Sequence, residues 1–142
     1  MMYNIIKDRI VEGNMRNNPS DFGSKVICEY RRGVNMSDNI IMAKYQGLGN
    51  DYLILDAVRN RVQIQGKKAA LLCQRGFGLG ADGVLYGPVQ INGKMGVHIF
   101  NADGSESPIS GNGVRIFAKY LIDQGYVKES KFDIETMAGT IE

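Results

Sequence analysis

The chain has 142 residues, a net charge of +2 and 44% apolar residues, which suits one soluble globular domain with its own core. The small net charge and the lack of basic runs argue against nucleic acid as a partner. No apolar run approaches the roughly 20 residues of a membrane span, and residues 1–8 lack signal-peptide features. Cys28 and Cys73 show neither metal-ligand nor disulfide spacing, so we expect free thiols, no bound metal and a cytoplasmic protein.

Residues 1–41 are expected to be a polar N-terminal extension. They carry no sustained hydrophobic period apart from a short apolar run at residues 26–28, so we expect them to be poorly ordered or weakly attached. Translation through a purine-rich ribosome-binding site would give Arg31-Arg32-Gly33 shortly before Met36. We therefore expect the native protein to begin at Met36 or Met42, and the folded domain to span residues 42–142.

The remaining chain alternates apolar runs with glycine-rich turns. Asn92-Gly93 is the strongest hairpin signal in the sequence. One amphipathic helix is expected at residues 66–74. Strands are expected at residues 40–45, 52–56, 84–86, 96–100 and 131–136.

A second helix is expected from Val114 to Gln124. Its apolar residues recur with helical spacing, and Ile116 and Tyr120 add apolar surface on its flank. The inward stripe consists of Val114, Phe117, Ala118, Leu121 and Ile122. Gly125 is placed to end the helix in a left-handed conformation. A helix apolar around most of its circumference needs to be surrounded, which predicts an α+β fold with a sheet around this central helix, at about residues 113–124.

The turn before this helix is the main candidate functional site. Ser110 or Asn112 is able to cap the helix, and Gly111 and Gly113 leave backbone N–H groups open to a ligand. Free donors at the positive end of a helix dipole attract anions. The alternative is an ordinary capped core helix.

Other motifs have weaker functional interpretations. Gly78-x-Gly80-x-x-Gly83 matches the dinucleotide fingerprint as a string, but it follows a predicted helix and opens a strand, which is the reverse of the required order. His98 lies within a predicted strand and Cys73 on an apolar helical stripe, so neither indicates a nucleophile with its base.

Three asparagines lie beside glycines at predicted turns. Asn50, Asn101 and Asn112 have the simple interpretation of turn residues. Together they suggest a pocket of neutral donors beside a helix start, suited to a zwitterion with a carboxylate and an ammonium group.

Four ordered motifs resemble the amino-terminal half of the diaminopimelate epimerase family. They are Lys44-Tyr45-Gln46-Gly47-Leu48-Gly49-Asn50-Asp51-Tyr52, Gly78-Leu79-Gly80-Ala81-Asp82-Gly83-Val84-Leu85, Phe100-Asn101-Ala102-Asp103-Gly104-Ser105 and Ser110-Gly111-Asn112-Gly113-Val114-Arg115. The resemblance covers about residues 42–139. It implies two pseudo-symmetric domains, each with a mixed, mostly antiparallel sheet around a central helix, and an amino-acid substrate in the cleft between them.

The resemblance also implies a mechanism without pyridoxal phosphate, other cofactor or metal. Two cysteines, one from each domain, exchange a proton at the α-carbon and interconvert LL- and meso-diaminopimelate. By position, Asn50 and Asn101 match substrate-binding residues, and Gly111 and Asn112 match the backbone and side chain beside the catalytic thiol. The family further implies a cytoplasmic homodimer in lysine and peptidoglycan precursor biosynthesis.

Two features depart from the family pattern. Ser110 occupies the position of the catalytic cysteine, and a hydroxyl is a far weaker acid than a thiol of pKa about 8.5. The sequence ends at Glu142, so the second domain is expected to be absent and the fragment alone inactive. The alternatives are a related isomerase acting on another amino acid, and a non-catalytic amino-acid-binding domain.

Overall fold

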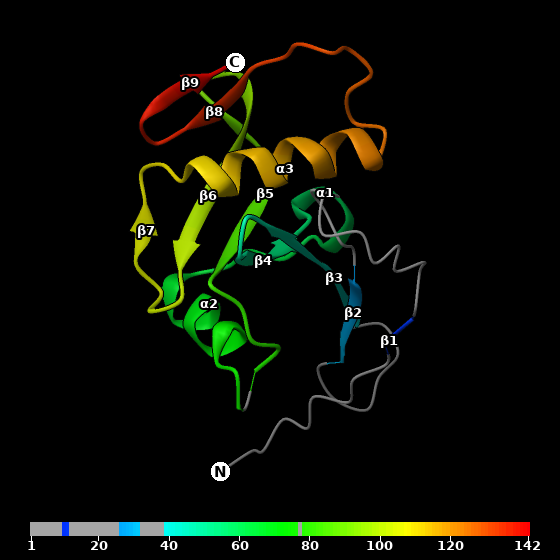
Figure 1. The fold of residues 1–142 in the computed structure, drawn as a ribbon, viewed down its shortest axis with the longest axis vertical. Helices are drawn as coiled ribbons and strands as arrows, with labels where there is room; N and C mark the ends of the chain where they lie inside the picture. Colours follow the sequence, from blue (N-terminus) through cyan, green and yellow to red (C-terminus); the bar gives the residue numbers. More distant parts are fainter. Residues whose placement is uncertain (1–9, 12–25, 32–38, 77) are drawn as a thin grey trace.

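The computed structural model describes residues 10–11, 26–31, 39–76 and 78–142 (Figure 1). The expected N-terminal extension lies largely outside the described residues, as does Met36, so the predictions made for them remain predictions.

The strands form a single sheet with the order β1-β2-β3-β4-β5-β6-β8-β9, in which β7 also pairs with β6. Neighbouring strands are antiparallel, except that β4 pairs with β5 and β6 with β8 in parallel. The fold is therefore α+β with a mixed, mostly antiparallel sheet, as the sequence indicated. The strands are β1 (Ile10–Val11), β2 (Val26–Arg31), β3 (Asn39–Gly47), β4 (Asn50–Leu55), β5 (Gly83–Ile91), β6 (Lys94–Asn101), β7 (Glu106–Ser107), β8 (Ile134–Thr136) and β9 (Gly139–Ile141).

Helices pack on both faces of the sheet. The described helices are α1 (Ala57–Asn60), α2 (Gly66–Cys73) and α3 (Gly111–Asp123). Successive side chains of β4 point to opposite faces, as in any strand. Tyr52 and Ile54 belong to the core beneath α3, whereas Leu53 and Leu55 belong to the core beneath α2. The two apolar clusters thus lie on either side of one sheet.

The buried face of α3 differs from the expected stripe. Ile116 and Tyr120, which were expected on the flank, are buried, whereas Ile122 is 50% exposed. The hydroxyl of Tyr120 donates a hydrogen bond of 2.6 Å to the buried carboxylate of Asp56. This bond lies on the buried face of α3, and Ile122 lies on the exposed side.

The C-terminus of α3 confirms the predicted stop at Gly125. Gly125 has a φ of 74°, and its N–H donates to the carbonyl of Ile122 over 3.0 Å. The N–H of Tyr126 donates to the carbonyl of Leu121 over 2.9 Å. These two bonds form a Schellman motif, which favours glycine at the left-handed position.

Other predicted elements differ in accuracy. The hairpin at Asn92-Gly93 is confirmed, because both residues have positive φ values of 52° and 76° and connect β5 to β6. The strand expected at residues 131–136 is wrong in its first half, since β8 begins at Ile134 and forms an unpredicted hairpin with β9. None of the described helices is long and apolar enough to cross a membrane.

Candidate functional site

The start of α3 presents backbone donors. Ser110 is the N-cap, with extended φ and ψ of −143° and 117°, and its Oγ accepts from the N–H of Gly113 over 3.1 Å. The first N–H groups of a helix have no acceptor within the helix. The cap therefore satisfies Gly113 and leaves the N–H groups of Gly111 and Asn112 without an intrahelical acceptor. Ser110, rather than Asn112, is the capping residue.

Tyr52 reaches the cap from β4. Its hydroxyl lies 3.0 Å from Oγ of Ser110, and the residue is only 6% exposed. Gly83 makes room for the ring. A Cβ at Gly83 would lie 2.6 Å from Cε1 of Tyr52 and 2.5 Å from the carbonyl oxygen of Phe100. The third glycine of the fingerprint-like string thus provides space for an aromatic ring beside the cap.

Strand register places Asn50 and Asn101 near this cap. Gly83 pairs with both Tyr52 and Asn101, and Asn50 precedes Tyr52 by two residues on β4. Alternation then directs both asparagines to the face of the sheet that carries α3. With strands about 4.8 Å apart and a rise of about 3.4 Å per residue, the backbone of Asn101 lies roughly 10 Å and that of Asn50 roughly 7 Å from Tyr52.

The asparagines also have local structural roles. Asn101 donates from Nδ2 to Oγ of Ser105 over 3.0 Å and from its backbone N–H to the carbonyl of Ser105 over 2.8 Å, which closes the turn after β6. Asn101 is exposed, whereas Asn50 and Asn112 are half-buried. The turn-forming interpretation therefore holds for Asn101. Its side-chain amide lies at the solvent-exposed end of the sheet.

An ionic cluster on the opposite face holds the loop before β5. Arg75 contacts both carboxylate oxygens of Asp51, at 2.9 and 3.2 Å, and contacts Asp82 at 3.0 Å. Nζ of Lys44 lies 3.1 Å from Asp51. Burial alone would raise the pKa of Asp51, but the hydrogen bonds from Arg75 and Lys44 hold it well below its ordinary value. The loop follows α2 and leads into β5, so the structural context of a dinucleotide site is absent there.

The other candidate reactive groups are not positioned for nucleophilic work. Cys73 is buried, and burial together with the nearby Asp51 raises the pKa of its thiol to about 11. His98 stacks on Tyr86, and its Nδ1 lies 2.6 Å from Oε1 of Glu106. No group of three side chains able to hold a metal ion occurs among the described residues.

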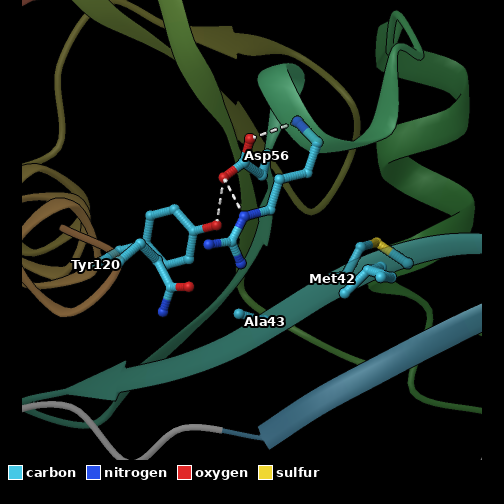
Figure 2. Close-up of a pocket in the computed structure, with 7 residues that line it drawn as sticks. Met42, Ala43, Asp56 and Tyr120 are labelled. Carbon is cyan, nitrogen blue, oxygen red and sulfur yellow. Dashed lines mark hydrogen bonds and ion pairs between the residues drawn. The ribbon is translucent and has the colours of Figure 1, made fainter. Parts of the chain in front are cut away.

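A second polar cluster anchors the other end of α3. Asp56 is 2% exposed and caps α1 by accepting from the N–H groups of Val58 and Arg59. Its second oxygen accepts from the hydroxyls of Tyr120 and Tyr126 at 2.6 and 2.8 Å. Figure 2 shows the Asp56 carboxylate beside Tyr120, in a small pocket lined also by Met42 and Ala43. Nε of Arg59 lies 3.7 Å from the same carboxylate. With its oxygens fully used, this carboxylate is a structural anchor.

The chain is thus an α+β domain whose helix α3 starts with two backbone N–H groups that have no acceptor within the helix. The family model described as diaminopimelate epimerase matches residues 42–142. The chain therefore belongs to the diaminopimelate epimerase family.

Individual relatives agree with the family match. The chain is 45% identical over 100 residues to diaminopimelate epimerase 2 of Nostoc sp. and 42% identical over 106 residues to diaminopimelate epimerase of Methanocella arvoryzae. These alignments cover 70% and 72% of this chain but only 35% and 38% of the two relatives. The chain thus spans little more than a third of the length of these curated relatives.

Proposed function

We propose that residues 42–142 form the amino-terminal domain of a cofactor-independent diaminopimelate epimerase-type isomerase. The complete enzyme interconverts LL- and meso-diaminopimelate by proton transfer at the α-carbon, as a cytoplasmic homodimer in lysine and peptidoglycan precursor biosynthesis. The family match and the names of the relatives support this proposal. In this proposal, residues 42–142 contribute the binding site for the α-carboxylate of the amino acid.

Each part of the site has a role in this proposal. The N–H groups of Gly111 and Asn112, with the dipole of α3, hold the α-carboxylate and stabilise the charge that develops during proton abstraction. The amides of Asn50, Asn101 and Asn112 bind the remaining polar atoms. The observation that carries the proposal is the pair of backbone donors left open at the start of α3, at the same end of the sheet as Asn50 and Asn101.

Ser110 supports a second candidate function, which is amino-acid binding without catalysis. A serine hydroxyl needs a neighbouring base to accept its proton. Among the described residues, the hydrogen-bond partners of its Oγ are the hydroxyl of Tyr52 and the N–H of Gly113, and neither is a carboxylate, imidazole or amine. Ser110 therefore acts as a hydrogen-bonding residue at the position of the family's catalytic cysteine.

Ligand titration of the 142-residue chain tests the site. Backbone amide resonances are followed by NMR while meso-diaminopimelate is added, with 1,5-diaminopentane, which lacks both carboxylates, as the control. We expect the amide signals of Gly111 and Asn112 to move with the amino acid and to stay in place with the diamine. Signals that stay in place with both compounds, or that move equally with both, would refute the carboxylate site.

Solvent deuterium incorporation distinguishes the isomerase function from amino-acid binding without catalysis. The isomerase proposal requires incorporation at the α-carbon of LL- or meso-diaminopimelate when this chain is joined to the carboxyl-terminal part of a relative. Ser110→Cys should raise the rate, because a thiol at a helix N-terminus ionises far more readily than a hydroxyl. Binding without any incorporation in either form would establish the non-catalytic function instead.

A further inference from the structure

Two arrangements of the hydroxyl protons fit the contact between Ser110 and Tyr52. A hydroxyl has one proton to donate and two lone pairs to accept with. The N–H of Gly113 uses one lone pair, over 3.1 Å. At 3.0 Å, the hydroxyl of Tyr52 is either the donor for the second lone pair or the acceptor of the Ser110 proton. Only the first arrangement leaves the Ser110 proton available to a ligand.

The position of the Tyr52 hydroxyl is fixed by packing. Tyr52 is buried in the core beneath α3, and its ring lies against Gly83, where even a Cβ atom would come within 2.6 Å of it. A ring held in this way fixes the position of the phenolic oxygen, and among the described residues Oγ of Ser110 is the partner within hydrogen-bond distance of it. Ser110, by contrast, lies at the edge of the site next to the open backbone of Gly111.

We propose that Tyr52 is a positioning residue that donates its phenolic hydrogen bond to Oγ of Ser110 and so directs the Ser110 proton toward the ligand at the start of α3. This inference rests on the proposed function for the identity of the ligand. The bond between Tyr52 and the residue at position 110 does not depend on it and is tested separately.

The first test uses a titratable group at position 110. In the Ser110→Cys variant, a hydrogen bond donated by Tyr52 favours the thiolate and lowers the pKa of the thiol. Alkylation of this thiol by iodoacetamide is measured against pH, with peptide mass spectrometry separating it from Cys28 and Cys73. Adding Tyr52→Phe, which keeps the ring, should raise the pKa by about 0.5–1 unit and slow alkylation at neutral pH about 3- to 10-fold.

Tyr45→Phe is the matched control. Tyr45 pairs with Tyr52 in the β3–β4 register, but its hydroxyl bonds to Oδ2 of Asp123 near the other end of α3, over 3.1 Å. Added to Ser110→Cys, it should leave the thiol pKa unchanged. An equal pKa in the presence and absence of Tyr52→Phe, or an equal shift with both phenylalanine variants, would overturn the inference.

The second test measures affinity for meso-diaminopimelate by NMR titration. Tyr52→Phe should weaken binding about 3- to 10-fold in the chain with Ser110 and have no effect in the Ser110→Ala background, because the hydroxyl acts through Ser110. Equal weakening in both backgrounds would contradict a role through Ser110. If the chain with Ser110 does not bind the ligand at all, the proposed function fails, while the thiol measurement still decides the role of Tyr52.

Discussion

At the residue scale, Gly111 offers a direct test of the backbone donor. It is the first residue of α3, and a Cβ added there would have no atom within 4 Å. Proline is favoured at this helix position, and the extended backbone of Ser110 is compatible with a following proline. Gly111→Pro therefore removes one N–H while the helix start keeps its conformation.

We expect Gly111→Pro to weaken binding of meso-diaminopimelate about 10-fold, because one hydrogen bond to a charged carboxylate is lost. Gly111→Ala keeps the N–H and should bind like the unchanged chain. Calorimetric or NMR titration measures both affinities, and thermal unfolding checks that both variants fold. Comparable affinities for the two variants would show that this N–H does not contact the ligand.

Some residues of the site could be predicted from the sequence, and others could not. Ser110 was one of two predicted caps, with Asn112 as the other, because a cap depends only on the three residues that follow it. The contribution of Tyr52 was missed, since it depends on a contact across 58 positions of the chain. The available signal was the glycine at position 83, but assigning Tyr52 to it requires the parallel register of β4 and β5.

At the scale of elements, Gly83 determines how closely β4, β5 and β6 pack beneath α3. A Cβ at this position would lie 2.5 Å from the backbone carbonyl of Phe100, which cannot move without shifting β6. We expect Gly83→Ala to lower the free energy of unfolding by about 1–3 kcal/mol through overpacking. Gly76→Ala is the control, because nothing lies within 4 Å of its added Cβ. Urea unfolding of the two variants measures the difference, and equal stabilities would refute the tight packing at Gly83.

The stability that the loop before β5 contributes should depend on pH, because Asp51 is part of the ionic cluster that holds this loop. The pKa of Asp51 is lowered in the folded chain by Arg75 and Lys44, so the unfolded chain binds the proton more tightly. Its stabilisation is therefore present above the unfolded pKa of about 3.9 and is lost as the pH falls toward the folded value.

Asp51→Asn should consequently lower the free energy of unfolding by about 1–2 kcal/mol near pH 7, because it removes a charge-assisted bidentate contact. The difference from the unchanged chain should shrink as the pH is lowered from 5 toward 2. Urea unfolding at several pH values measures it, with the exposed Asp133→Asn as the control. A deficit that stays constant over this pH range would show that the charge of Asp51 is not responsible.

Elements with strong local signals were the ones predicted correctly. The Asn92-Gly93 hairpin and the helix ending at Gly125 have specific turn chemistry. The β8–β9 hairpin has strands of three residues each, and α1 has four residues, which is too short for any period to show. The buried side of α3 was predicted incorrectly at Ile122, because Tyr120 is drawn into the core, where it bonds to Asp56, and that polar contact is not visible in the apolar pattern.

At the scale of the whole molecule, the two ends of α3 differ: one carries the proposed binding site and the other is anchored to the sheet. It has 13 residues and is therefore about 20 Å long. Its N-terminus carries the open donors beside Ser110, whereas Tyr120, near its C-terminus, bonds to the buried Asp56. Asp56 also caps α1 and accepts from Tyr126, so a single carboxylate connects β4, α1, α3 and the segment after α3.

Asp56→Asn tests this separation. The amide oxygen still caps α1, but the amide nitrogen cannot accept from the tyrosine hydroxyls, so one buried and one partly buried bond to a charged group are lost. We expect the free energy of unfolding to fall by about 2–4 kcal/mol, while Tyr126→Phe, which removes one of the two bonds, costs about 1–2 kcal/mol. Because the anchor lies far from the start of α3, the folded Asp56→Asn chain should retain its affinity for meso-diaminopimelate. Urea unfolding and ligand titration of the same sample measure the two quantities, and a parallel loss of both would show that the anchor also positions the binding site.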